Sequence, residues 1–315
     1  MATSCATHDP SVPAASVGGW SVEQSTLSWL KDQQQSDGHW GTAEHRVELT
    51  SLVALAFLSQ GETPVSDKYG KTVENALRAL VRDVESETDQ SGESRALLAW
   101  ALAEAFGFTR VPMVLDAARV QAGKLNFDQA TPWHALAAQA LLLSGSCPEL
   151  GKQGIATMHS GFPSQTNSIL NQATHAILAM QVSDRNQVIS YLEAVRRLSP
   201  ARWRTHENPL PSAVMLSTAL LWTGGRDWQE WHKVFYTDVV SRQIKRKTLG
   251  WWTTESMGLT PRQLPDLAGA ERNIYVTCMV LLTFPPSRRL PSFKHLDAPG
   301  KASTDADEEI KVEIR

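Results

Sequence analysis

Two kinds of apolar pattern alternate along most of the chain. The first is an amphipathic stripe at helical spacing, formed by Val73, Ala76, Leu77, Leu80, Val81 and Val84. Charged residues, Lys71, Glu74, Arg78 and Arg82 among them, occupy the opposite side of the same segment. This spacing predicts a helix with one apolar face, which packs against the rest of the protein and leaves its other face in water.

The second pattern is apolar on nearly all sides. It covers six segments, residues 49–58, 94–106, 133–145, 168–180, 212–222 and 273–284. A helix without a polar face must be surrounded by other helices. The segments recur at intervals of roughly 40 to 60 residues, which is typical of stacked helical pairs.

An open solenoid and a closed ring both satisfy this repetition. In a solenoid both helices of a pair usually keep a side that faces solvent, whereas here one layer is uniformly apolar and the other amphipathic. We therefore expect an all-α fold, an α/α toroid of about six concentric helix pairs with the apolar helices inside. Gly61, Gly107, Gly145 and Gly224 are expected to end apolar helices, and Pro132 is expected to open one.

The two flanks differ from this region in composition. Residues 1–19 are small and polar, and residues 286–315 are polar and charged, so we expect a disordered N-terminal segment, a toroid domain over 20–285 and a flexible C-terminal tail. The opening residues lack the basic and apolar regions of a signal peptide. No stretch approaches the roughly 20 apolar residues of a membrane span. We expect a cytoplasmic protein.

Charge and cysteine content remove further classes of function. The net charge is −3, so no positive field argues for nucleic acid as a partner. A basic run, Arg242, Lys245, Arg246 and Lys247, is expected to end an outer helix, where the dipole favours positive charge. The three cysteines are far apart, which indicates a reducing compartment rather than a disulfide framework.

Residues 28–41, SWLKDQQQSDGHWG, resemble the Gln…Asp-Gly-x-Trp turn of prenyltransferase and squalene-cyclase repeats, with Gln35, Asp37, Gly38 and Trp40 as the matching residues. Residues 271–284 look like the closing inner helix of that ring, and GWWTT (250–254) looks like a degenerate second copy of the turn. The resemblance covers about residues 20 to 284 and implies a terpenoid cyclase/protein prenyltransferase-like toroid of bacterial type.

The reactions of that superfamily require residues that this chain does not show. Squalene-type cyclases use a D-x-D-D run, whose only look-alike here is Asp305–Glu308 in the charged tail. Protein prenyltransferases hold zinc with a His for which this chain has Val276, and no C-x-x-C or H-x-x-x-H replaces it. The Gly-Cys-Gly-Glu-Gln run of thioester domains is also missing. We therefore assign no catalytic residue, metal or cofactor.

Polar residues on the apolar helices remain as candidates for ligand binding. Parallel inner helices would gather their beginnings at one mouth of the ring, beside positive helix ends. The candidates there are Glu48, Trp133, His134, Asn171, His175 and Tyr275. The alternative interpretation is that these residues are helix caps and satisfied polar groups of the core.

Two functions stay open at this point. The first is a binding or scaffold module that holds an apolar or isoprenoid small molecule in the ring, or a protein partner. The second is an isoprenoid-processing enzyme, a cyclase or prenyltransferase relative, with a relocated acid such as Glu48 or Glu104. An open interior pocket would favour the enzyme, and an interior filled by Trp133 or Tyr275 would favour the binding module.

Overall fold

The computed structural model describes residues 21–86, 91–161, 168–181, 190–191, 193 and 200–284. These residues are predominantly helical, as expected from their patterning. The strands among them, β1 (Ile244–Arg246) and β2 (Leu249–Trp251), form one antiparallel hairpin. The N-terminal segment 1–19 and the tail 286–315 lie outside the described residues.

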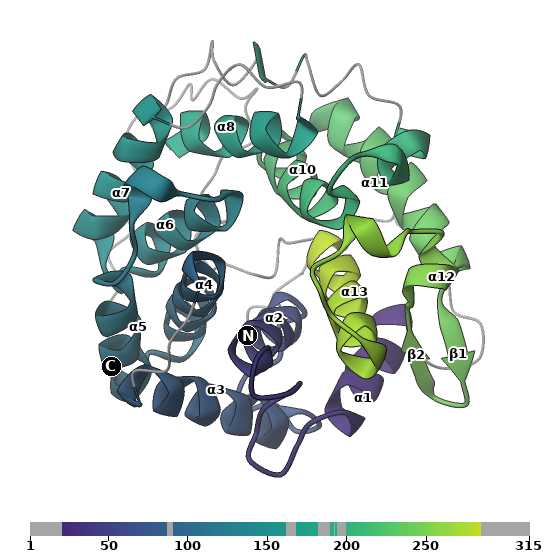
Figure 1. Cartoon of the computed structure of the whole chain (residues 1–315), viewed down its shortest axis with the longest axis horizontal. Helices are drawn as coiled ribbons and strands as arrows, with labels where there is room; N and C mark the ends of the chain where they lie inside the picture. Colours follow the sequence, from purple (N-terminus) through teal and green to yellow (C-terminus); the bar gives the residue numbers. More distant parts are fainter. Residues whose placement is uncertain are drawn as a thin grey trace, which may run out of the picture.

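The six apolar segments are helices in contact with one another. They are α2 (Arg46–Ser59), α4 (Gly92–Thr109), α6 (Pro132–Ser144), α8 (Ile169–Gln181), α10 (Pro209–Thr223) and α13 (Gly269–Thr283). Each packs on the next in this order, and α13 packs back on α2, so the contacts form a closed circuit (Figure 1). Every residue from 49 to 59 and from 96 to 107 is buried, which explains why these helices carry no polar face.

Amphipathic helices lie outside this circuit. They are α1 (Val22–Asp32), α3 (Gly70–Glu85), α5 (Pro112–Ala122), α7 (Pro148–Gly161) and α11 (Gly225–Ser241) (Figure 1). In α3 the predicted stripe is buried, while Lys71, Arg78 and Arg82 are exposed. Short elements complete the described chain: η1 (Phe127–Gln129), η2 (Pro200–Thr205), α12 (Thr254–Met257) and η3 (Pro261–Gln263).

Most helix ends follow the predicted punctuation. Pro132 is the first residue of α6, where its missing N–H costs nothing, and Gly145 ends α6 in the left-handed conformation with φ 73°. The prediction for Gly107 is wrong, because α4 continues to Thr109 and Arg110 takes the left-handed cap position. Gly107 instead allows close packing, since a Cβ there would lie 3.3 Å from the Ser144 Cβ.

The basic run near residue 245 is also placed differently from expectation. Helix α11 ends at Ser241, and Ile244–Arg246 form β1 rather than the end of the helix. Lys247 adopts φ 57° in the turn, and β2 then packs against α1. The hairpin forms because packing of its second strand on α1 overrides the helical tendency of the basic residues.

Two tryptophans make the same pair of hydrogen bonds in different parts of the chain. The Trp40 indole donates to the Leu30 carbonyl (2.8 Å), and its backbone N–H donates to Thr50 Oγ1 on α2 (3.1 Å). The Trp252 indole donates to the Val239 carbonyl (2.7 Å), and its backbone N–H donates to Thr277 Oγ1 on α13 (3.1 Å). Each tryptophan therefore ties the end of an outer helix to the following inner helix.

The turn that contains Trp40 is held by the other residues of the predicted motif. Gln35 Nε2 donates to the Gly41 carbonyl (2.8 Å), and the Asp37 carboxylate accepts from the His39 backbone N–H (3.1 Å). Gly38 has φ 95°, and a Cβ there would lie 2.6 Å from the Asn75 carbonyl oxygen. Glycine is therefore required at this position both by the backbone conformation and by the space available.

The last described elements close against the first ones. Trp251 stacks on Trp29 of α1, and Gln243 Nε2 donates to Thr26 Oγ1 (2.8 Å). On the inner side, Glu271 of α13 accepts from the Thr42 backbone N–H (2.5 Å). No helix of the described residues combines the length and apolar character that crossing a membrane requires.

Candidate functional site

Polar side chains of three inner helices affect one another through their charges. Glu48 lies in the first turn of α2 and Glu93 in the first turn of α4. Tyr275 was expected at the beginning of its helix, but α13 already begins at Gly269, so Tyr275 lies near the middle of α13. Helix α2 packs on both α4 and α13. The charge of Glu93 acts on Glu48, and both charges act on Tyr275. We call these three residues the acidic mouth.

The surroundings of the acidic mouth disfavour its charged forms. Burial raises the pKa of Glu48 above its usual value, the Glu93 charge raises it further, and His45 works in the opposite direction. Burial also raises the pKa of Glu93, although this side chain reaches solvent. The Tyr275 pKa is raised, first by burial and then by the two glutamates. Two carboxyls thus share a site in which full ionisation of both is unfavourable.

The side chains of the acidic mouth have no hydrogen-bond or ion-pair partner among the described residues. No hydrogen bond or ion pair there joins a side-chain oxygen of Glu48, Glu93 or Tyr275 to another protein group. The Tyr275 side chain is nevertheless only 3% exposed. None of the three side chains contributes an oxygen to the fully buried, unpartnered polar atoms of the described residues, so water can satisfy them.

Trp133 and His134 begin α6 and have structural contacts instead. Trp133 is buried and stacks on Trp100 of α4, with ring centroids 6.2 Å apart. His134 Nδ1 accepts from the Thr131 backbone N–H (3.1 Å) in a capping box. Burial lowers the His134 pKa to about 4, which keeps the ring neutral and suits the acceptor role. These contacts agree with the interpretation of His134 as a helix cap.

Asn171 and His175 share one face of α8, as their spacing predicts. Asn171 is half-buried, and the buried His175 ring stacks on Tyr191 with centroids 4.8 Å apart. Within the described part of the chain, no contact joins either side chain to the acidic mouth. Of the six predicted residues, Glu48 and Tyr275 are linked by the effect of the Glu48 charge on the Tyr275 pKa.

Sequence reasoning missed Glu93, the third member of the acidic mouth. Glu93 occupies the first turn of the second apolar helix, the same place that Glu48 occupies in the first one. The rule that selected Glu48 could therefore have selected Glu93. Glu104, the other acid considered, is eleven residues further along α4, about 16 Å at 1.5 Å per residue, and accepts a hydrogen bond from the Trp100 indole (2.7 Å).

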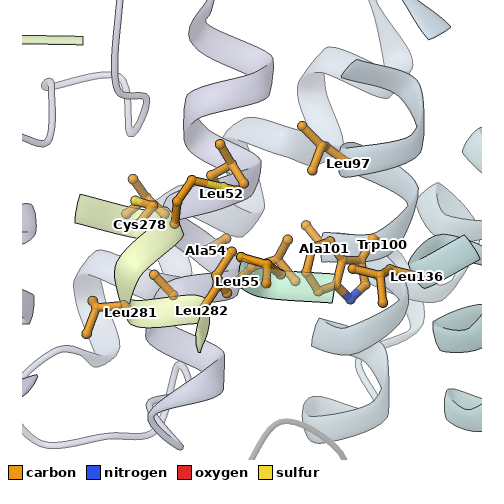
Figure 2. Close-up of a cluster of buried hydrophobic side chains, with 14 of the residues drawn as sticks. Leu52, Ala54, Leu55, Leu97, Trp100, Ala101, Leu136, Cys278, Leu281 and Leu282 are labelled. Atoms are coloured by element: carbon orange, nitrogen blue, oxygen red, sulfur yellow. The ribbon is translucent and has the colours of Figure 1, made fainter. Parts of the chain in front are cut away.

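Side chains fill the space between the inner helices around α2. Figure 2 shows buried side chains of α2, α4, α6 and α13 in one cluster, including Leu55, Ala101, Leu136 and Leu282. A small cavity of about 10 Å³ lies elsewhere, between α8, η2, α10 and α11, beside Trp203 and Trp231. Its volume suits a single water molecule rather than an isoprenoid chain.

The described residues contain no group of three or more His, Cys, Asp or Glu side chains placed to hold a metal ion. At the position where the family resemblance implies a zinc ligand, Val276 is buried in α13. Cys278 is two residues further on, and burial raises the pKa of its thiol well above the usual value. A protonated, buried thiol is a poor metal ligand.

Comparisons with protein-family models, with curated proteins and with solved structures find no match. The kinship implied by the Trp40 turn therefore stays a prediction, and the site is interpreted from its own chemistry.

Proposed function

We propose that the chain is an α/α toroid of the prenyltransferase/squalene-cyclase type and serves as a binding module, with a small-molecule ligand at the acidic mouth. Two features support the fold assignment: the closed circuit of contacts among the inner helices, and the equivalent hydrogen bonds of Trp40 and Trp252. The second feature agrees with the predicted degenerate copy of the turn at residues 250–254.

The observation that carries the binding function is the unpartnered state of the acidic mouth. Two carboxyls and a phenol affect one another there through their charges, and no group of the described residues hydrogen-bonds to their side chains. A ligand with complementary polar groups would take the place of water at these oxygens. The filled space between the inner helices supports a ligand that lies at the mouth rather than one threaded through the ring.

Native mass spectrometry tests this function. The purified chain is incubated with a small-molecule extract of its source cells and then analysed for bound mass. A retained molecule is expected for the unmodified chain and for Asp116→Asn, which removes an exposed carboxylate on α5. The double variant Glu48→Gln/Glu93→Gln is expected to lose it. Equal retention by all three proteins, or retention by none, would contradict the proposed site.

An isoprenoid-processing enzyme is the second candidate, and the raised pKa of Glu48 is the observation that favours it. A carboxyl that stays protonated closer to neutral pH is suited to donate a proton. Incubation with squalene, farnesyl diphosphate or geranylgeranyl diphosphate, followed by product analysis, tests this candidate. Product formation that Glu48→Gln abolishes would replace the binding function with catalysis.

A further inference from the structure

Aromatic side chains form a ladder along one flank of the outer helix α11 (Figure 1). Trp228, His232 and Tyr236 follow one another at spacings of four residues, so they lie on the same side of the helix. The ring centroids of Trp228 and His232 are 5.0 Å apart, and those of His232 and Tyr236 are 5.2 Å apart. All three side chains are partly exposed, whereas the neighbouring Trp231 and Phe235 are buried. We call the three residues the aromatic ladder.

The last described residue, Phe284, packs against one end of the aromatic ladder. Its ring centroid lies 5.0 Å from that of Tyr236, and it meets the Trp252 ring edge-on at 6.1 Å. Phe284 is 1% exposed, so the core holds it in place. The residues that follow Phe284 therefore begin beside Tyr236, within reach of the other two rings.

The sequence after Phe284 suits the aromatic ladder in conformation and length. Pro285 and Pro286 each hold φ near about −65°, which favours the extended polyproline II conformation. Such a segment advances about 3.1 Å per residue. The ladder extends from Trp228 to Tyr236, about 12 Å at 1.5 Å per helical residue. About four residues beyond Phe284 are therefore enough to span it.

His232 provides a polar group in the middle of the aromatic ladder. Its Nε2 atom is buried and has no hydrogen-bond partner in the described part of the chain. Burial lowers the pKa of His232, so the ring is neutral and can accept a hydrogen bond through one nitrogen. Proline has no N–H, so Ser287 is the first residue after Phe284 that can donate one from its backbone. An extended segment places Ser287 about one helical turn from Tyr236, level with His232.

The charges at the far end of the aromatic ladder complement those of the same segment. Arg288 and Arg289 come next in the sequence. The first two turns of α11 contain Asp227 and Glu230 and one cation, Arg226, which pairs with Glu230 (2.7 Å). Two carboxylates and one guanidinium leave one net negative charge there, which attracts the two arginines.

We propose that residues 285–289 of this chain dock on the aromatic ladder, with the proline rings against Tyr236 and His232 and the arginines at the beginning of α11. Proline-rich segments bind aromatic surfaces because the polyproline II conformation is ordered before binding and loses little entropy. The docked segment covers rings that are otherwise partly exposed. This inference concerns the outer side of the fold and does not depend on the proposed ligand site.

Disulfide cross-linking in the full chain tests where the segment lies. Ser287→Cys is combined with Gln229→Cys, an exposed position beside Trp228 on α11. The matched control combines Ser287→Cys with Gln24→Cys, an exposed position on α1 that adjoins Glu23, the acceptor of a 3.5 Å hydrogen bond from Tyr236. Both pairs are made in the background Cys5→Ser/Cys147→Ser, which leaves the buried Cys278 as the remaining native thiol.

We expect the intramolecular disulfide to form about tenfold faster with Gln229→Cys than with Gln24→Cys, because docking raises the effective concentration of the thiol at α11. Pro285→Gly/Pro286→Gly should reduce the difference severalfold, since glycine increases the entropy that docking costs. Pro299→Gly, further along the tail, should leave it unchanged. Equal rates at the two positions, or a faster reaction at residue 24, overturn the proposal. Disulfide-linked dimers in place of monomers assign the segment to a second copy and also overturn it.

Discussion

Trp29 and Trp251 stack with ring centroids 5.7 Å apart and an angle of 15° between the ring planes. Trp29 belongs to α1, the first described helix, and Trp251 belongs to strand β2 of the hairpin. Trp29 is 7% exposed, so this contact is largely removed from water. Together with the hydrogen bond from Gln243 to Thr26, it joins the first and last outer elements. The contribution of this contact between the first and last outer elements to stability can therefore be measured at the stack.

A double-mutant cycle on this pair tests closure. Trp29→Ala is expected to lower the free energy of unfolding by about 3 kcal/mol, and Trp251→Ala by less, because Trp251 is only half-buried. The coupling between the two substitutions should be about 1 kcal/mol, the usual contribution of an aromatic pair. Urea unfolding of the four proteins measures it. Strictly additive effects would show that the stack does not stabilise the fold.

Stability should fall as the pH rises above about 6.5, because of His39. The hydrogen bond to Asp83 (3.0 Å) raises the His39 pKa, burial opposes this, and Asp37 adds to the rise. His39 Nδ1 lies 3.0 Å from the Asp37 carboxylate without hydrogen-bonding geometry, so that contact is ionic. Arg46 shares Asp83 (3.5 Å).

The sign follows from the direction of this shift. A raised pKa in the folded state contributes stability below the unfolded value of about 6.5, and this contribution is lost as pH rises through the folded pKa. Each unit of difference corresponds to about 1.4 kcal/mol. Thermal unfolding between about pH 6 and 9 measures the loss, and His39→Gln should flatten the profile. An unchanged slope in that variant would assign the pH dependence to another group.

Glu48→Gln should stabilise the protein at neutral pH. The pKa of Glu48 is raised by burial and by Glu93, so its stabilising contribution is present below the unfolded pKa and lost as pH rises through the folded one. The neutral amide avoids the cost of ionisation, and the melting temperature at about pH 7 should rise while that at about pH 4 changes little. Asp116→Asn serves as the control for charge removal. A lower melting temperature for Glu48→Gln at both pH values would contradict this account.

Trp40→Phe and Trp252→Phe should destabilise the protein by similar amounts. Each substitution removes the indole N–H that satisfies a backbone carbonyl, of Leu30 or of Val239, in buried surroundings. A lost partner of this kind costs about 1–3 kcal/mol. Chemical unfolding compares the two variants. Thr50→Val and Thr277→Val extend the comparison to the second hydrogen bond of each turn, and a large loss at only one of the two turns would refute their equivalence.

The inner helices could be predicted from the sequence because a helix that is apolar on all sides is stable in water only when other helices surround it. Other features depended on contacts between segments far apart in sequence. Gly107 was predicted to end a helix, but its lack of a side chain instead allows Ser144 to pack closely against α4. The basic residues near Lys245 were predicted to be helical, but they lie in a hairpin whose second strand places Trp251 on Trp29. The position of Glu93 in the first turn of its helix was open to prediction, but its electrostatic effect on Glu48 and Tyr275 was not, whereas the contact of His134 with Thr131 is local in sequence.

The contact between the hairpin and α1 also affects folding during synthesis of the chain. Helix α1 leaves the ribosome early, with the Trp29 ring on its surface, and the strand that covers this ring is synthesised much later. Contacts of such long sequence separation slow folding, and exposed apolar surface promotes association with other molecules during the delay. Nascent chains truncated before residue 244 should therefore recruit chaperones at α1, and release from them should coincide with the emergence of β2.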